Sequence, residues 1–199
     1  MATAFDQVFA LVLGHEGRLS MTRGDAGNWT GGKVGVGELR GSKYGISAAA
    51  YPTLDIAGLT LAQARTIAWA DYWLAARCDL LPAMLALLVF DAAYNNGAGR
   101  AVRWLQAAVG ATADGLFGTR TAARVATATG TPDGLRAVCA RFLDERLWFM
   151  AGLKTWPDNR GWSTRLTLLP FQAAALAAWA AGPATIPTPP PIGATQAAA

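Results

Sequence analysis

The sequence predicts a mainly α-helical protein with one irregular, glycine-rich segment near its beginning. The 199 residues are 53% hydrophobic and only 15% charged, and alanine, the best intrinsic helix former, supplies much of the apolar count. Apolar residues recur at helical spacing along most of the chain. Residues 17–47 instead contain a dense series of glycines, which predicts loops and a small β-hairpin lobe.

The first helix is expected over residues 3–16. Thr3 is placed to cap it, and Asp6, at the third helical position, lies near the positive end of the helix dipole. Gly17 ends the pattern, so Glu16 is expected in the last turn. The residues expected to face the core are Phe5, Val8, Phe9 and Val12.

The glycine-rich segment that follows is expected to form loops with one or two short hairpins, around Lys33–Leu39 and Lys43–Ile46. A helical protein that has about 30 residues of irregular structure usually has them for function. We therefore expect the chemistry to lie at or beside this lobe.

Further helices are expected after the lobe. The capping box Thr60-Leu61-Ala62-Gln63 begins the first of them, Pro82 suits the first turn of the second, and Thr131-Pro132 begins the longest. The chain is rich in proline after Gly182, which predicts an extended tail over residues 182–199. The expected helical ranges are 60–76, 83–94, 98–109, 119–128, 131–152 and 163–180.

Two carboxyl groups in contrasting surroundings, Glu16 and Asp25, are candidates for acid–base chemistry. The negative end of the first helix disfavours the ionised form of Glu16 and so raises its pKa, as a general acid near neutral pH requires. Asp25 lies in a polar, glycine-rich turn that is open to solvent and to backbone N–H groups. Glycoside hydrolysis commonly divides the acid role and the base or nucleophile role between two such groups.

The composition excludes several classes of function. The net charge of +4 favours a polyanionic partner, but no run of five or more Lys and Arg residues indicates nucleic acid. The longest apolar stretches, Met84–Phe90 and Ala173–Ala181, are shorter than the ~20 residues that span a membrane, so stable insertion is not expected. The first ten residues carry no Lys or Arg, and no secretory signal is expected.

No metal or other cofactor is expected. His15 is the only histidine, and the two cysteines, Cys78 and Cys139, show no metal-like spacing. Both cysteines are expected to be reduced, buried, small apolar residues.

Three short motifs lie around the two carboxyl groups: His15-Glu16-Gly17, Asp25-Ala26-Gly27 and Lys43-Tyr44-Gly45-Ile46-Ser47. Together they resemble the signature of glycoside hydrolase family 108, which runs Glu-Gly-Gly-Tyr, then Asp-Pro-Gly, then Thr-Asn-Tyr/Phe-Gly-Ile-Thr. Residues 101–170 resemble the predicted peptidoglycan-binding module that usually follows. Arg18, Leu19 and Ala26 depart from the family pattern, and Asn28–Arg40 is an insertion.

The resemblance implies a lysozyme-like fold with the hairpin lobe beside the active-site cleft. It implies an N-acetylmuramidase of the phage endolysin type, which hydrolyses the β-1,4 bond between N-acetylmuramic acid and N-acetylglucosamine in bacterial peptidoglycan and so lyses the cell. Glu16 takes the catalytic role. Residues 1–97 would form the catalytic region, residues 98–181 a helical peptidoglycan-binding-like region packed on it, and residues 182–199 the tail.

The Glu16–Asp25 spacing is also similar to that in phage-type lysozymes, where a threonine after the aspartate helps to place the attacking water. Ser42, by its place before the Tyr-Gly-Ile motif, or Thr30, by its spacing, would have that role here. The residues expected to bind substrate are Trp29, Tyr44, Tyr94 and Asn95.

Two alternative functions stay open from sequence: a lytic transglycosylase, and a non-catalytic wall-binding protein of a phage-like particle. A separation of ~5 Å between the carboxyl groups would indicate a retaining mechanism, and ~6.5–9.5 Å an inverting one. The protein is expected to be made in the cytoplasm without a signal peptide. It would act as a monomer on the cell wall in the periplasm, after release through a holin or other pore.

Overall fold

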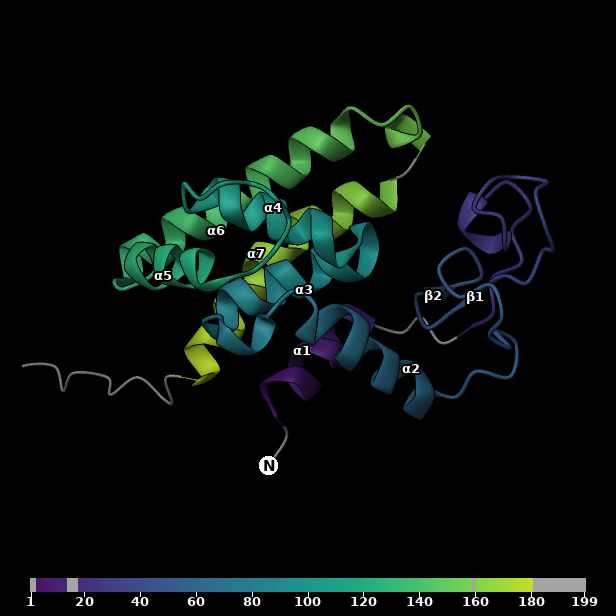
Figure 1. The fold of residues 1–199 in the computed structure, drawn as a ribbon, viewed down its shortest axis with the longest axis horizontal. Coiled ribbons are helices and arrows are strands. Elements are labelled where there is room, and N and C mark those ends of the chain that lie inside the picture. Colours follow the sequence, from purple (N-terminus) through teal and green to yellow (C-terminus); the bar gives the residue numbers. More distant parts are fainter. Residues whose placement is uncertain (1–2, 14–17, 159, 181–199) are drawn as a thin grey trace, which may run out of the picture.

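The computed structural model describes residues 3–13, 18–158 and 160–180 of the chain. Within these residues it contains seven α-helices and one two-stranded antiparallel hairpin. Figure 1 shows the helices gathered in one body, with the glycine-rich lobe at one end of it. The expectation of a mainly α fold with a small hairpin lobe is confirmed.

The helices agree with most of the expected ranges, although the last one begins at Arg160 rather than Ser163 and continues through Pro170. The α-helices are Ala4–Leu13 (α1), Leu61–Ile67 (α2), Ala83–Asn96 (α3), Ala98–Ala108 (α4), Thr119–Ala128 (α5), Pro132–Ala151 (α6) and Arg160–Ala180 (α7). The strands are Ser42–Lys43 (β1) and Ile46–Ser47 (β2). Short helical segments lie at Ala26–Asn28 (η1), Ala68–Leu74 (η2), Cys78–Leu80 (η3) and Trp156–Asp158 (η4).

The start of α1 has the expected cap. Thr3 Oγ1 accepts a hydrogen bond from Asp6 N (3.2 Å), and the Asp6 carboxylate accepts one from Thr3 N (2.9 Å). Asp6 also accepts from Arg65 Nε on α2 (3.0 Å), and this bond, followed by those of Thr3, lowers the pKa of Asp6 to about 2. The described part of α1 ends at Leu13, so Glu16 of the expected last turn lies outside the described residues.

The single helix expected over residues 60–76 is instead an α-helix followed by the π-helix η2. Its capping box is confirmed, because Thr60 Oγ1 accepts from Gln63 N and Gln63 Oε1 accepts from Thr60 N. In an α-helix, residues five apart point about 140° away from each other, whereas the i→i+5 bonds of a π-helix bring them to the same side. Ala68 and Trp73 are therefore buried together, at 0% and 3% exposure.

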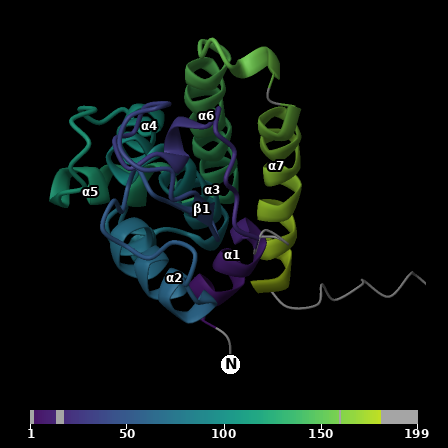
Figure 2. The ribbon, with the colours of Figure 1, turned by 90° about the vertical axis from the view of Figure 1, so that its right-hand side faces the viewer.

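The central helix of the body is α3. Its residues from Leu85 to Ala93 are all buried, and it packs against α1, α4, α6 and α7 (Figures 1 and 2). One continuous hydrophobic cluster contains residues of both halves of the chain, from Phe5 on α1 to Leu176 on α7. The regions expected at 1–97 and 98–181 therefore share a core, and the described residues do not divide into two separate modules.

A buried charge network joins distant parts of the chain. Asp91 on α3 is 1% exposed, and its carboxylate accepts hydrogen bonds from Arg146 Nη1 on α6 (2.6 Å) and from Arg165 Nε on α7 (2.6 Å). Arg146 is fully buried, and its Nε donates to Asn96 Oδ1 (3.1 Å). Arg165 Nη2 donates to the carbonyl oxygen of Val12, near the end of α1 (3.1 Å). One carboxylate thus fixes α3, α6, α7 and the end of α1 relative to one another.

The expectation of a hairpin around Lys33–Leu39 was wrong. The segment contains no strand; an isolated β-bridge joins Trp29 to Leu39 at its base, and two backbone hydrogen bonds, from Thr30 N to the Glu38 oxygen and from Gly31 N to the Val36 oxygen, lie beyond it. The physical reason is the repeated left-handed backbone, which turns the chain too often for a ladder to form; the glycines with positive φ are Gly32, Gly35 and Gly37. The hairpin expected around Lys43–Ile46 is confirmed as β1–β2.

Both cysteines are buried and unpaired, as expected. Burial raises the pKa of the two thiols, that of Cys139 to about 12. Over the described ranges, none of the helices combines the length and the apolarity that crossing a bilayer takes.

We expect Asp91→Asn to lower the free energy of unfolding by about 3–5 kcal/mol, because it leaves the buried Arg146 guanidinium without its counter-charge. Equilibrium unfolding in urea measures the loss. The matched control is Asp133→Asn, which breaks the exposed pair Asp133–Arg136 and should cost less than about 1 kcal/mol. Equal losses in the two variants would contradict the role given to the Asp91 network.

Candidate active site

The glycine-rich lobe contains the hairpin β1–β2, whose two-residue turn is Tyr44-Gly45. Ser42 pairs with Ser47 across this turn. Tyr44 and Gly45 both have positive φ, at 54° and 80°, as a type I′ turn requires. The Tyr-Gly pair of the sequence motif is therefore the turn itself, and it sets the register of the two strands.

Tyr94 on α3 holds this turn against the helical body. Its hydroxyl donates to the carbonyl oxygen of Tyr44, and a Cβ on Gly45 would stand 2.4 Å from Cε1 of its ring. The ring packs against Phe90 and Tyr72, with centroid distances of 5.5 and 4.9 Å. Burial raises the pKa of Tyr94. Tyr44 and Tyr94, both expected to bind substrate, are in contact, and the Tyr94 hydroxyl is bonded to the turn.

All four tyrosines of the chain lie at this junction between lobe and body. Tyr72 and Tyr94 pack against the main core as well as against a small second core under the lobe, so they connect the two. The Tyr51 hydroxyl donates to Asp71 Oδ2 on η2 (2.7 Å), and burial raises the pKa of Tyr51 and of Tyr72. The second core consists of Ile46, Ala48, Ile56, Leu59 and Ala64.

Three serines lie on neighbouring strands beside the turn. The backbone of Ser42 exchanges two hydrogen bonds with Ser20 (2.8 and 3.0 Å) on one side and pairs with Ser47 on the other. Residues directly opposite each other on antiparallel strands place their side chains on the same face. Ser20, Ser42 and Ser47 therefore form a line of hydroxyl groups, which we call the serine row.

Asp25 lies next to one end of the serine row. It caps η1, and its Oδ1 accepts a hydrogen bond from Gly27 N (2.8 Å). A Cβ on Gly27 would stand 3.2 Å from Asp25 Oδ1 and 3.7 Å from Ser47 Cβ, so the carboxylate and Ser47 are neighbours. Asp25 is exposed, and among the described residues none donates to its second oxygen. This is an oriented carboxylate that faces solvent, as activation of a water or stabilisation of a cation requires.

Trp29 and Thr30 form hydrogen bonds within the lobe. The indole N–H of Trp29 donates to the carbonyl oxygen of Arg23 (2.9 Å), and its ring is half-buried. Thr30 Oγ1 accepts from Glu38 N (2.9 Å). Of the two residues expected to place a water, Thr30 thus has its hydroxyl bonded inside the loop, whereas Ser42 is in the serine row.

The insertion Asn28–Arg40 closes on itself. The carbonyl oxygen of Asn28 accepts from both Arg40 N and Gly41 N (3.0 Å each), so the two ends of the insertion meet. Asn28 is fully buried, and its Nδ2 donates to the carbonyl oxygen of Thr22 (3.0 Å). The insertion therefore leaves Asp25 and the hairpin next to each other.

Glu16 and His15 lie outside the described residues. The segment that carries them connects the end of α1 to Ser20 of the serine row. The hydrogen bond from Arg165 to the Val12 carbonyl places a positive charge near the end of α1.

Asn95 is exposed in the last turn of α3, and its Nδ2 donates to the Asp91 carbonyl oxygen (2.7 Å). Its side chain is thus hydrogen-bonded to the backbone of its own helix. In the part of the chain that the structure describes, no group of three or more His, Cys, Asp and Glu side chains is arranged to hold a metal ion.

The sequence analysis did not select Ser47 as a candidate. The comparison with phage-type lysozymes pointed to Thr30 by spacing, and closeness to the motif pointed to Ser42. The signal that identifies Ser47 is the strand register, because a two-residue turn at Tyr44-Gly45 places Ser47 opposite Ser42.

Comparison with known proteins gives one family match and a similar solved structure. Residues 9–97, which include Glu16, Asp25 and the hairpin, match the family described as Glycosyl hydrolase 108. The solved structure of Brucella abortus SagA superposes with a TM-score of 0.73 and 26% sequence identity, over 87% of this chain and 95% of SagA. Curated protein sequences contain no significant match. Since the superposition extends well beyond residue 97, the later helices belong to the shared fold.

We expect Gly45→Ala to lower the free energy of unfolding by about 1–3 kcal/mol. The backbone at residue 45 has a positive φ, which strains alanine, and the added Cβ would meet the Tyr94 ring. Urea unfolding measures the change. The matched control is Gly99→Ala on α4, where a Cβ meets nothing within 4 Å; it should leave stability unchanged or raise it by up to about 1 kcal/mol. A neutral Gly45→Ala would show that the turn does not depend on its contact with Tyr94.

Proposed function

We propose that this chain, in which residues 9–97 match the glycosyl hydrolase 108 family, is an N-acetylmuramidase. It would hydrolyse the β-1,4 bond between N-acetylmuramic acid and N-acetylglucosamine in bacterial peptidoglycan. The observation that carries the proposal is that the family match includes the whole glycine-rich lobe. The matched segment also contains Glu16, and in the lobe Asp25 lies exposed and oriented beside the serine row.

In the proposed reaction Glu16 is the general acid and donates its proton to the departing glycosidic oxygen. Asp25 either stabilises the developing positive charge or accepts a proton from the attacking water. The water adds to the sugar carbon as the glycosidic bond breaks, so one water is consumed for each bond. The Ser47 hydroxyl, next to Asp25, with Ser42 as its neighbour, is placed to hold that water. No metal or other cofactor takes part.

We propose that the sugar chain lies along the lobe. Tyr44 offers a half-buried ring with Lys43 Nζ 5.5 Å from its centre, and Trp29 a half-buried ring fixed through its N–H. Tyr94 contributes by holding Tyr44 in place, and the exposed Asn95 lies beside it on α3.

The wider role proposed is that of a phage-type endolysin. A monomer made in the cytoplasm would reach the wall in the periplasm through a holin or other pore and lyse the cell. The helices after residue 97 would contribute to binding peptidoglycan while completing the common core.

Glu16→Gln should reduce the rate of peptidoglycan solubilisation by about 10²–10⁴-fold, because it removes the general acid. Loss of turbidity of purified peptidoglycan gives the rate, and mass spectrometry gives the products. Hydrolysis yields reducing N-acetylmuramic acid ends. The matched control, Glu145→Gln at an exposed site on α6, should keep the wild-type rate.

Two results would replace this function with another. Products lighter by one water, with anhydro-sugar ends, would identify a lytic transglycosylase. A wild-type protein that sediments with the wall without solubilising it would identify a non-catalytic wall-binding protein.

Asp25→Asn should slow hydrolysis by about 10²-fold or more, and Ser47→Ala by about tenfold, the cost of one hydrogen bond to a catalytic water. Initial rates on purified peptidoglycan measure both, with circular dichroism to confirm the fold. A loss of rate in Thr30→Ala together with a wild-type rate in Ser47→Ala would move the water-placing role from the serine row to Thr30.

A further inference from the structure

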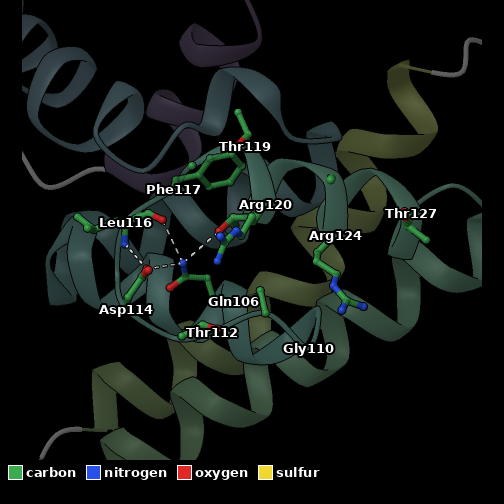
Figure 3. Close-up of a pocket in the computed structure, with 14 residues that line it drawn as sticks. Gln106, Gly110, Thr112, Asp114, Leu116, Phe117, Thr119, Arg120, Arg124 and Thr127 are labelled. Atoms are coloured by element: carbon green, nitrogen blue, oxygen red, sulfur yellow. Dashed lines mark hydrogen bonds between the residues drawn. The ribbon is translucent and has the colours of Figure 1, made fainter.

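A cleft of about 940 Å³ lies far from the lobe, between α5 and the loop that joins it to α4. Figure 3 shows its two sides: the loop with Asp114 and Leu116, and α5 with the side chains of Arg120 and Arg124. Thr112, Thr119 and Thr127 place hydroxyl groups along it. None of these residues belongs to the proposed active site.

One buried side-chain amide, that of Gln106, holds together the elements that line this cleft. Gln106 on α4 is 1% exposed, and its Nε2 donates to Asp114 Oδ1 (2.7 Å), the Leu116 carbonyl oxygen (3.1 Å) and Thr121 Oγ1 (3.1 Å). Its Oε1 accepts from Gly115 N (2.8 Å). The side chain therefore joins α4, the loop and α5, and the cleft is a fixed feature of the fold.

The only carboxylate among the lining residues is already engaged. Asp114 Oδ1 accepts from Leu116 N (2.8 Å) as well as from Gln106, and these bonds lower the pKa of Asp114. Asp114 thus serves to fix the loop. Its carboxylate stays ionised, but with two arginines among the lining residues, at 120 and 124, the net charge of the lining is positive.

Arg120 and Arg124 supply this charge. They are exposed, four residues apart on the same face of α5, and neither forms a hydrogen bond or ion pair within the described chain. Like charges at this spacing destabilise a helix slightly. Other arginines of this half are engaged: Arg100 lies over the Phe149 ring, Arg136 pairs with Asp133 and Arg141 donates to the Ala108 carbonyl oxygen.

We propose that this cleft is a second binding site, and that its ligand is a carboxylate group of the peptide chains of peptidoglycan. The assignment of the polymer rests on the proposed function, whereas the preference for an anion rests on the cleft alone. A guanidinium presents paired N–H donors that match the two oxygens of a carboxylate. The threonine hydroxyls and the apolar side chains of Leu116 and Phe117 suit the peptide around that group.

The test uses the Glu16→Gln protein, so that the wall stays intact while binding is measured. Purified peptidoglycan sacculi are mixed with this protein at 4 °C, and the bound fraction is measured by sedimentation. Adding Arg120→Gln and Arg124→Gln should raise the apparent dissociation constant roughly fivefold or more. Arg120→Lys with Arg124→Lys, which keeps the charge and removes the paired donors, should give an intermediate value.

The matched control removes two positive charges elsewhere. Lys154→Gln with Arg160→Gln, at the connection between α6 and α7, should bind as the Glu16→Gln protein does. In a second arm the carboxylates of the sacculi are converted to amides. The glutamine variant and its Glu16→Gln parent should then bind equally weakly, because the group that distinguishes them is gone.

Two results would overturn the proposal. Equal binding of the Arg120/Arg124 glutamine variant and its parent to untreated sacculi would show that the cleft does not bind the wall. A difference that persists on amidated sacculi would show that the ligand is another anion, such as a phosphate. Neither result depends on catalysis, so failure of the muramidase proposal in the turbidity assay is distinguishable from failure of this one.

Discussion

One buried carboxylate, that of Asp91, constrains the arrangement of the helical body. An ionised group in the interior costs several kcal/mol unless partners compensate it, so the fold must bring guanidinium groups to both of its oxygens. Arg146 on α6 and Arg165 on α7 each donate a hydrogen bond to this carboxylate. Arg165 also donates one to the Val12 carbonyl oxygen near the end of α1. The helix that leads into Glu16 is therefore held by a residue that lies near the other end of the chain. The helical core is shared between the matched segment 9–97 and the helices that follow it, and the similarity to SagA likewise extends over most of the chain.

The lobe is attached to this body by a different kind of contact. Tyr94 contacts the hairpin turn through its ring and its hydroxyl while packing on the main core, and the Tyr51 hydroxyl donates to Asp71 on η2. The turn fixes the register of β1 and β2, and the register in turn places Ser42 and Ser47 side by side, with Asp25 next to Ser47. A disturbance at Gly45 thus reaches the serine row through the backbone, without any change to the polar residues themselves.

The sequence predicted those structural features that depend on interactions between residues close together in the chain. The caps at Thr3 and Thr60 follow from side chains that bond to backbone within three residues, and both are present. The β1–β2 hairpin was expected from the glycine-rich sequence around it. The π-helix η2 was missed because its burial pattern depends on the packing of Trp73 against Phe5 on α1 and Phe90 on α3, which lie outside any local window of the sequence. The Asp91 network and the place of Ser47 depend on residues brought together by the fold, so no spacing in the sequence indicates them.

The positively charged residues have different roles, which the net charge alone does not distinguish. A net charge of +4 favours a polyanionic partner, yet Arg146 and Arg165 neutralise a buried carboxylate, and Arg65 stabilises the start of α1. Arg120 and Arg124 neutralise no carboxylate among the described residues, and they line a cleft whose shape is fixed by Gln106. Helix α5, which lines this cleft, and the lobe lie toward opposite ends of the body in Figure 1. Two sites held apart on one rigid core suit a long polymer better than a single disaccharide, because binding at one raises the effective concentration of the strand at the other. For an enzyme on an insoluble wall, such a second contact keeps the protein near uncut bonds after each cleavage.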